Sequence, residues 1–180
     1  AIFFWFTGFN AIETFFSTYG ETILKIDKSV SSMLLLSVSV MFLITAIPAG
    51  IISRKLGRKK TILVGLCMFI AACIILIFVK NVTVMYFILG FGGISWALIN
   101  INSYPMVVEM TSSQGIGKYT GYYYFFSMLA AIISPTLYGF LADTFGDGLL
   151  FIYASVALVI ALFFMMLVKH GEVAVEEKKG

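Results

Sequence analysis

The sequence predicts an all-α, polytopic membrane protein, and two observations support this fold class. First, 61% of the 180 residues are hydrophobic and only 12% are charged, whereas soluble domains carry about 25% charged residues. A water-soluble chain of this length cannot bury so large an apolar surface. Second, apolar stretches recur along the chain, each near the roughly 20 residues that a helix needs to cross a bilayer.

Six such stretches are separated by short segments that are polar, basic or rich in glycine. Residues 1–170 are therefore expected to form one six-helix transmembrane bundle, and residues 171–180 a charged cytoplasmic tail. The predicted spans are about residues 1–22, 30–53, 61–79, 83–108, 117–142 and 148–168.

Basic residues are distributed unequally between the two sets of alternating loops. The less basic set holds Lys25, Lys28 and Lys80. Lys and Arg in short loops accumulate on the cytoplasmic side of a membrane protein. This rule predicts that residues 54–60 and the C-terminus lie in the cytoplasm. We expect an integral membrane protein, with a bacterial plasma membrane as its location. The residues of the more basic set are Arg54, Lys55, Arg58, Lys59, Lys60, Lys118, Lys169, Lys178 and Lys179.

An eight-residue pattern closes both the second and the fifth predicted helix. Residues 50–57 read GIISRKLG and residues 139–146 read GFLADTFG. If the six helices are two units of three, the second unit is inverted relative to the first, which is a common transporter arrangement. The alternative is chance, since glycine is frequent at helix ends. The matched positions are Gly50, Arg54 and Gly57 in the first copy, and Gly139, Asp143 and Gly146 in the second.

The helices also differ in polarity. The third and the sixth carry no charged or amide side chain over residues 62–79 and 156–168, whereas the other four carry nearly all the polar residues within the membrane. The third and sixth helices are therefore expected to face lipid, with the other four lining an interior.

The segment GIISRKLGRKKTIL, which contains the first copy, resembles the helix–loop–helix signature of the major facilitator superfamily, G-x-L-A-D-R-x-G-R-K-x-x-L. Gly50, Gly57, Arg58 and Lys59 match it, and Arg54 stands where the signature has Asp. Residues 101–143 resemble the last helices of sucrose-transporter-like and glycoside–pentoside–hexuronide:cation symporters. FFWFTGFNAIETFFSTYG, residues 3–20, is similar to their seventh helix.

This resemblance implies the C-terminal six-helix half of a twelve-helix transporter. Such a half would work with an N-terminal six-helix half by alternating access. The implied function is secondary active transport of a small solute, a sugar or glycoside, coupled to a proton or sodium ion. The alternative is a non-transporting six-helix membrane scaffold or partner subunit.

Polar residues inside the predicted spans are the candidates for substrate contact. Thr7, Asn10, Glu13, Thr14 and Ser17 share one face of the first helix, at about 100° per residue. A carboxylate at that depth is costly and usually faces an interior cavity. The alternative for this face is structural hydrogen bonding to another helix. The candidate substrate-binding residues are Asn10, Glu13, Ser17, Trp96 and Asn102.

The fourth helix carries Ser95, Asn102 and Glu109 at seven-residue spacing, again on one face. Glu109 lies close to the inner interface, where an ion pair with Lys118 or the basic cluster is the expected role. Trp96 offers an aromatic face that can stack on a sugar ring; the alternative is packing in the core.

Catalytic chemistry has no support in the sequence. His170 is the only histidine, and no His, Cys and carboxylate cluster has the spacing of metal ligands. Cys67 and Cys73 are six residues apart and point to different helix faces. We therefore expect neither an enzyme nor a cofactor or metal, and no nucleic-acid partner.

Overall fold

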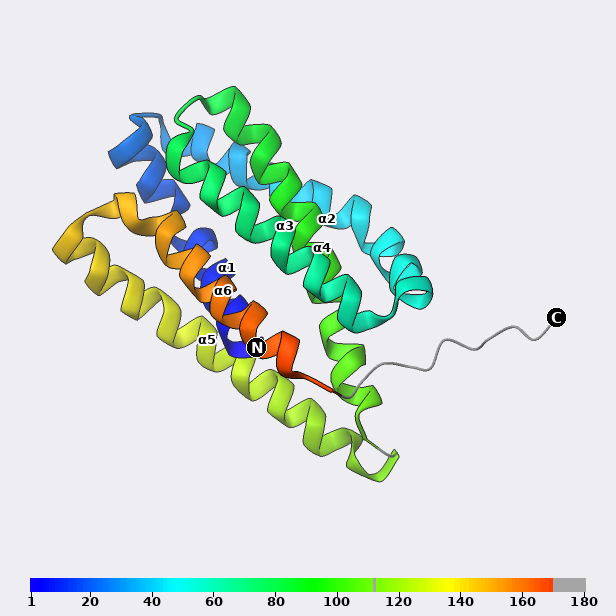
Figure 1. The fold of residues 1–180 in the computed structure, drawn as a ribbon. Helices are drawn as coiled ribbons and strands as arrows, with labels where there is room; N and C mark the ends of the chain where they lie inside the picture. The colour runs from blue at the N-terminus through cyan, green and yellow to red at the C-terminus, as the bar shows by residue number, and fades with distance from the viewer. Residues whose placement is uncertain (112, 170–180) are drawn as a thin grey trace.

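The computed structural model describes residues 1–111 and 113–169, and almost all of this part of the chain is helical (Figure 1). It contains no β-strand there, so the all-α prediction is confirmed. The predicted tail, residues 171–180, lies outside the described residues. The long helices are α1 (Ile2–Tyr19), α2 (Lys28–Leu56), α3 (Arg58–Phe78), α4 (Val82–Glu109), α5 (Ile116–Phe145) and α6 (Leu150–Leu167).

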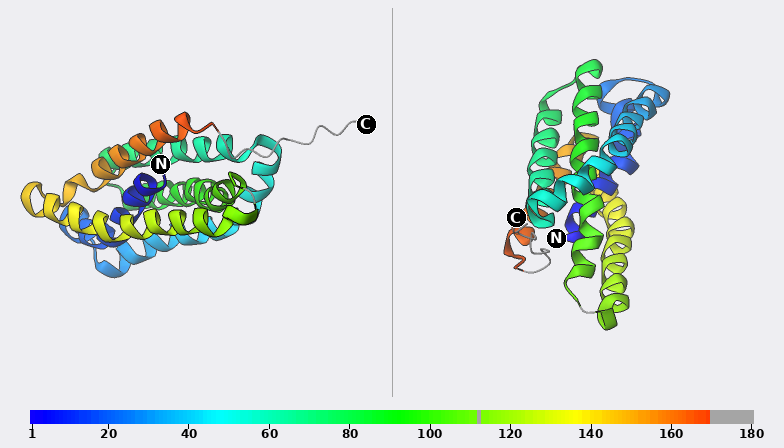
Figure 2. Two further views of the ribbon diagram at one scale, coloured as in Figure 1. Left: turned by 90° about the horizontal axis from the view of Figure 1, so that it is seen from below. Right: turned by 90° about the vertical axis from the view of Figure 1, so that its right-hand side faces the viewer.

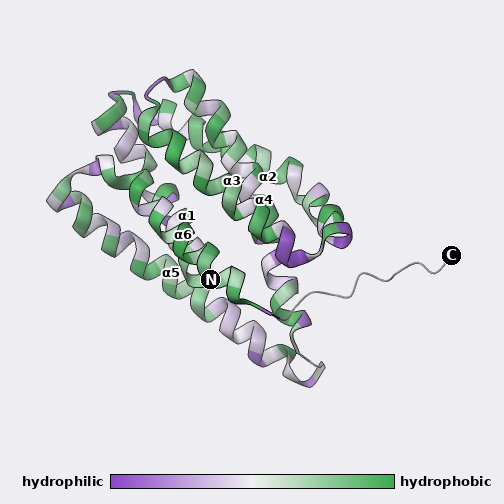
Figure 3. Cartoon of the chain, viewed as in Figure 1, coloured by the Kyte–Doolittle hydropathy of each residue, from purple (hydrophilic) through white to green (hydrophobic). Residues whose placement is uncertain are grey.

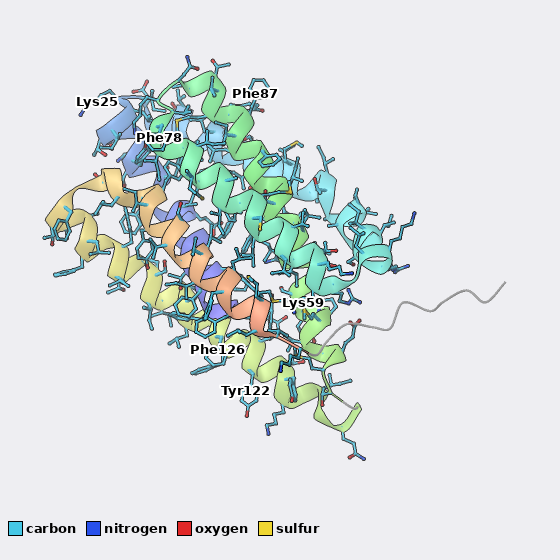
Figure 4. The ribbon with its side chains drawn as sticks, in the orientation of Figure 1. Lys25, Lys59, Phe78, Phe87, Tyr122 and Phe126 are labelled. Carbon is cyan, nitrogen blue, oxygen red and sulfur yellow. The ribbon has the colours of Figure 1, made fainter. Side chains whose placement is uncertain are left out.

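Short helical pieces lie in three of the connections. A π-helix, η1 (Gly20–Leu24), extends α1, and 3-10 turns, η2 (Ser113–Gly115) and η3 (Asp147–Leu149), precede α5 and α6. The long helices alternate in direction, so the α2–α3 and α4–α5 connections lie at one end of the bundle and the other three at the opposite end (Figure 1). Lys25 and Lys59 mark these opposite ends in Figure 4.

Among the described residues, five helical segments are long and apolar enough to cross a membrane, namely α2, α3, α4, α5 and Asp147–Leu167. Among the six long helices, α1 alone does not meet that standard. Its 18 residues include Asn10 and Glu13, which interrupt an otherwise apolar and aromatic sequence. Because polar side chains are costly in lipid, the side chains of α1 need partners in the protein or in water.

The helices pack in two groups that α3 and α6 join (Figure 2). In one group α4 packs against α2 and α3, and in the other α1 packs against α5 and α6. Side chains from both groups, including Phe16, Leu66, Ile99 and Leu158, are fully buried in one continuous core. This arrangement surrounds α1 and α4 with neighbours.

The long helices differ in how much of their surface the described chain itself buries. In α2 and in α5, 17% of the most apolar 18-residue stretch is buried, compared with 44% in α3 and in the segment that contains α6. Within the described chain, α2 and α5 are therefore more exposed than α3 and α6. Both α3 and α6, which lack charged and amide side chains over residues 62–79 and 156–168, thus bury part of their surface against α4 and α1. Their contact with lipid stays a prediction.

Two glycines allow the α4 group to pack closely. A Cβ atom on Gly93 would collide with the backbone carbonyl of Val38 in α2. A Cβ atom on Gly65 of α3 would lie 2.9 Å from the carbonyl oxygen of Ser95 in α4. Small residues at helix crossings let membrane helices approach until their backbones touch.

Candidate functional site

The polar face of α1 is exposed on one side of a helix that is otherwise deeply packed. Trp5, Ala11, Ile12 and Phe16 of α1 are buried in the core. On the polar face Glu13 and Thr14 are exposed, and Asn10 and Ser17 are half-buried. Four of the five residues of the predicted polar stripe are therefore at least partly exposed, whereas the fifth, Thr7, is buried.

A cavity of about 270 Å³ lies where this face meets α2. Its polar lining residues are Glu13 from α1, and Ser32 and Ser39 from α2. Within residues 1–111 and 113–169, neither an ion pair nor a side-chain hydrogen bond engages the Glu13 carboxylate. The remaining lining residues are apolar: Phe9, Ile12, Leu35, Leu36, Val38 and Phe69.

A carboxylate in such surroundings is chemically available. It can accept hydrogen bonds from hydroxyl groups, bind a proton, or attract an organic cation. The aromatic rings of Phe9 and Phe69, whose centroids are 6.4 Å apart, supply an apolar wall beside it. The cavity therefore combines one acidic group with a largely apolar surface.

Thr7 and Asn10, two other residues of the α1 face, differ in their hydrogen bonding. The Thr7 hydroxyl donates to the carbonyl oxygen of Phe3, and the Ser134 hydroxyl of α5 donates to the carbonyl oxygen of Thr7 at 2.6 Å. The Asn10 amide nitrogen is buried and has no acceptor among the described residues. Asn10 therefore has unused hydrogen-bonding capacity, as Glu13 does.

Trp96 does not line the Glu13 cavity. Its side chain is 5% exposed and stacks on Phe9 with 4.0 Å between ring centroids. Phe6 meets the same indole edge-to-face at 5.4 Å. Trp96 therefore supports the cavity wall from behind through Phe9.

Asn102 lies in the contact between α2 and α4 and is fully buried. Its amide nitrogen donates to the carbonyl oxygen of Leu98 at 2.9 Å and to that of Ala49 at 3.4 Å. Its side-chain oxygen has no donor among the described residues. Of the five residues predicted to bind substrate, Asn10, Glu13 and Ser17 lie together on α1, and Trp96 and Asn102 lie within helix contacts.

The basic turn between α2 and α3 forms two polar contacts with other helices. The guanidinium of Arg58 donates to both carboxylate oxygens of Glu109, at the end of α4. This contact confirms the expected ion pair between Glu109 and the basic cluster. The Lys59 ammonium donates to the carbonyl oxygens of Val168 at 2.6 Å and Met166 at 3.2 Å, at the end of α6.

The Lys59 contact was not predicted from the sequence. The last carbonyls of a helix lack partners within the helix, and a cation there also meets the negative end of the helix dipole. No pattern along the chain indicates that α6 ends beside residue 59. A second contact that the sequence did not indicate lies at the other end of the bundle, where the Lys80 ammonium donates to the Tyr19 hydroxyl at 2.7 Å.

The glycines of the two repeated segments have matching geometry. Gly57 ends α2 at φ 88° and ψ 147°, and Gly146 ends α5 at φ 92° and ψ 158°. The Gly57 amide donates to Ser53, and the Gly146 amide donates to Ala142. The charged positions, Arg54 and Asp143, are both exposed.

The inner faces of α2 and α5 at the earlier glycines are also similar. A Cβ atom on Gly50 would lie 4.0 Å from Ile101 of α4, and one on Gly139 would lie 3.4 Å from Phe15 of α1. Each glycine therefore faces the helix against which its own helix packs.

A larger cavity of about 520 Å³ surrounds the first turn of α1. Phe3, Phe4 and Trp5 of α1 line it together with Met106 of α4 and Phe126 of α5. No charged side chain lines it, and the Trp5 indole nitrogen has no acceptor among the described residues.

Comparison with known proteins assigns the chain to a family. The model of the Major Facilitator Superfamily matches residues 1–180. The chain is also similar to a protein of Bacillus subtilis (strain 168) named "Multidrug resistance protein 2", with 29% identity over 156 residues. That alignment covers 87% of this chain and 39% of the relative, so the chain spans about two fifths of the relative's length. The chain belongs to the major facilitator superfamily of membrane transporters.

Proposed function

We propose that this chain is the C-terminal half of a secondary active transporter, which moves a small organic solute by alternating access together with an N-terminal six-helix half. The Glu13 carboxylate carries the proposal. It is exposed on a membrane helix, lines a cavity and has no partner within the described residues. An acidic residue inside a membrane protein is expected to serve a solute or ion pathway.

The lining of the cavity favours a solute with a cationic group and an apolar body. One carboxylate and two hydroxyl groups stand among aromatic and aliphatic side chains. Such a surface excludes water from the apolar part of a ligand, while the carboxylate attracts its charge. The name of the Bacillus relative, a multidrug resistance protein, favours a drug-like organic solute over a sugar.

A sugar or glycoside coupled to a proton or sodium ion is the second candidate. Asn10, Glu13 and Ser17 supply the amide, carboxylate and hydroxyl groups that bind sugar hydroxyls. Trp96 and Asn102 are buried in helix contacts, however, and of the three α1 residues Glu13 alone lines the cavity in the described part of the chain. Fewer polar groups then remain for a ligand that has many hydroxyls, which is why we rank the sugar second.

The 3+3 inverted repeat is part of the same proposal. In such a repeat α1 corresponds to α4, α2 to α5, and α3 to α6. The helix contacts follow this correspondence, because α1 packs against α5 and α6, and α4 packs against α2 and α3. The positive φ values of Gly57 and Gly146 agree with this exchange. Inverted repeats build transporters that open alternately to either side around a central site.

Uptake and efflux by the full-length transporter that contains this chain test the proposal. Glu13→Gln keeps the size of the side chain and removes its charge. We expect this variant to lose transport of a lipophilic cation such as ethidium, while the protein still inserts into the membrane. Loss of glucoside accumulation instead, with exchange intact, would assign Glu13 to cation coupling in sugar symport.

Glu21→Gln is the matched control, because Glu21 is exposed in η1 and pairs with Lys28 at 3.2 Å outside the cavity. Unchanged transport by Glu13→Gln at every pH, for both solute classes, would contradict the assigned role. A separate outcome, in which the parent protein itself moves neither solute, would favour the alternative of a non-transporting scaffold.

A further inference from the structure

The five basic residues of the α2–α3 turn divide into two groups. Arg58 and Lys59 point into the protein, where they bind Glu109 and the last carbonyls of α6. Arg54, Lys55 and Lys60 are exposed, and no ion pair or side-chain hydrogen bond engages them within residues 1–111 and 113–169. Within the described residues, the charges of these outer three side chains are therefore unpaired.

The local charge balance at this turn is strongly positive. Glu109 supplies the one carboxylate paired with the turn among the described residues. The first turn of α3 contains no acidic residue, and Gly57 before it offers no side-chain cap. A helix start carries partial positive charge of its own and is destabilised by nearby cations. The exposed surface at this turn is therefore complementary to an anion.

Exposed apolar residues lie next to these cations. On the last turns of α2, Ile51 is 53% exposed and Leu56 is 52% exposed, on either side of Arg54 and Lys55. Figure 3 shows the hydrophilic turn between α2 and α3 directly beside hydrophobic stretches of both helices. A small inorganic anion would contact the cations alone. An anionic lipid can contact the cations with its headgroup and the apolar side chains with its acyl chains.

We propose that Arg54, Lys55 and Lys60 form a docking surface for the headgroup of an anionic phospholipid, with Ile51 and Leu56 against its acyl chains. Basic residues next to a membrane helix attract anionic lipids, at about 1 kcal/mol for each Lys or Arg. This surface is separate from the Glu13 cavity, and its occupancy does not depend on the transported solute.

Native mass spectrometry of the full-length transporter, purified in neutral detergent, tests the proposal. The protein is titrated with phosphatidylglycerol or phosphatidylcholine, and bound lipids are counted at low salt. We expect the parent to retain phosphatidylglycerol in preference to phosphatidylcholine. Combined replacement of Arg54, Lys55 and Lys60 by Gln should weaken phosphatidylglycerol retention on the order of 100-fold, since three charges are removed.

The matched control replaces Lys25, Lys28 and Lys80 by Gln, which removes the same charge from the opposite end of the bundle. It should retain phosphatidylglycerol as the parent does. Ile51→Ser with Leu56→Ser should also weaken retention, because the acyl chains lose their apolar contact.

Three results would overturn the proposal. The first is equal retention of phosphatidylglycerol by the parent and the triple variant at residues 54, 55 and 60. The second is displacement of the lipid by millimolar inorganic phosphate, which would make the surface a simple anion site. The third is equal weakening by the control variant, which would mean that only total charge matters.

Discussion

The Arg58 guanidinium and the Glu109 carboxylate form a two-pronged ion pair, with Nε to Oε2 at 2.7 Å and Nη2 to Oε1 at 2.5 Å. This pair joins the first residue of α3 to the last residue of α4. Both side chains are about one quarter exposed, at 24% and 26%. The planar guanidinium matches the carboxylate geometry, which Lys at position 58 would not reproduce.

Removal of either partner of this pair should destabilise the protein modestly. We expect Glu109→Gln or Arg58→Gln to lower the free energy of unfolding by about 1 kcal/mol, because the pair is partly screened by solvent. The double variant should lose little more than either single variant. Unfolding of the four proteins in detergent gives this double-mutant cycle. Additive losses in the double variant would show that the two side chains are not coupled.

Gly57 and Gly146 should each resist replacement by alanine. Their φ values, 88° and 92°, are ones that residues with a Cβ atom rarely adopt. We expect Gly57→Ala and Gly146→Ala each to cost about 1–3 kcal/mol of stability. Gly117→Ala is the control, since this helical glycine has open space around it and alanine favours helix there. Thermal unfolding of the three variants measures the difference, and equal stability of all three would contradict the prediction.

Close contact between α2 and α4 should depend on Gly93 and not on Gly92. An added Cβ atom on Gly93 meets the backbone of Val38, which cannot rotate away, whereas one on Gly92 lies 3.5 Å from the Phe69 ring. We expect Gly93→Ala to reduce stability by about 1–3 kcal/mol, as overpacking does. Gly92→Ala should behave like the parent. The yield and melting temperature of the folded protein report both effects, and tolerance of both changes would argue against the observed helix separation.

The orientation of the bundle can be tested by labelling single cysteines. In full-length protein whose Cys67 and Cys73 are replaced by alanine, Gly148→Cys should react with an impermeant maleimide on intact cells. Lys60→Cys should react only after the membrane is opened, because the basic turn is expected on the cytoplasmic side. Asp27→Cys, which lies at the same end as residue 148, should label like Gly148→Cys. Reaction of all three from outside would refute six alternating spans.

The number and approximate position of the helices could be predicted from the sequence because both depend on local hydropathy. The stretch predicted over about residues 61–79 is the helix Arg58–Phe78, and the one over about 83–108 is Val82–Glu109. The helix ends differ by a few residues. Polar and charged residues such as Arg58 and Glu109 continue the backbone hydrogen bonding beyond the apolar stretch.

The surroundings of individual side chains were harder to predict, because they depend on which helices meet. Spacing alone put Ser95, Asn102 and Glu109 on one face of α4. It predicted the pairing of Glu109 with the basic cluster, which Arg58 provides. It did not indicate that Ser95 and Asn102 meet Gly65 of α3 and Ala49 of α2 rather than a solute pathway. For Glu13 the cost of a charge in the membrane was itself informative, because it predicted a cavity beside the residue.

The contacts of Arg58 and Lys59 have a mechanical consequence. These consecutive residues attach the start of α3 to the ends of α4 and α6, so one turn of helix couples three helices. Sliding of any of these ends past another would break at least one charged contact. Movement at this end of the bundle is therefore favoured as a rigid body, in which the three helix ends shift together.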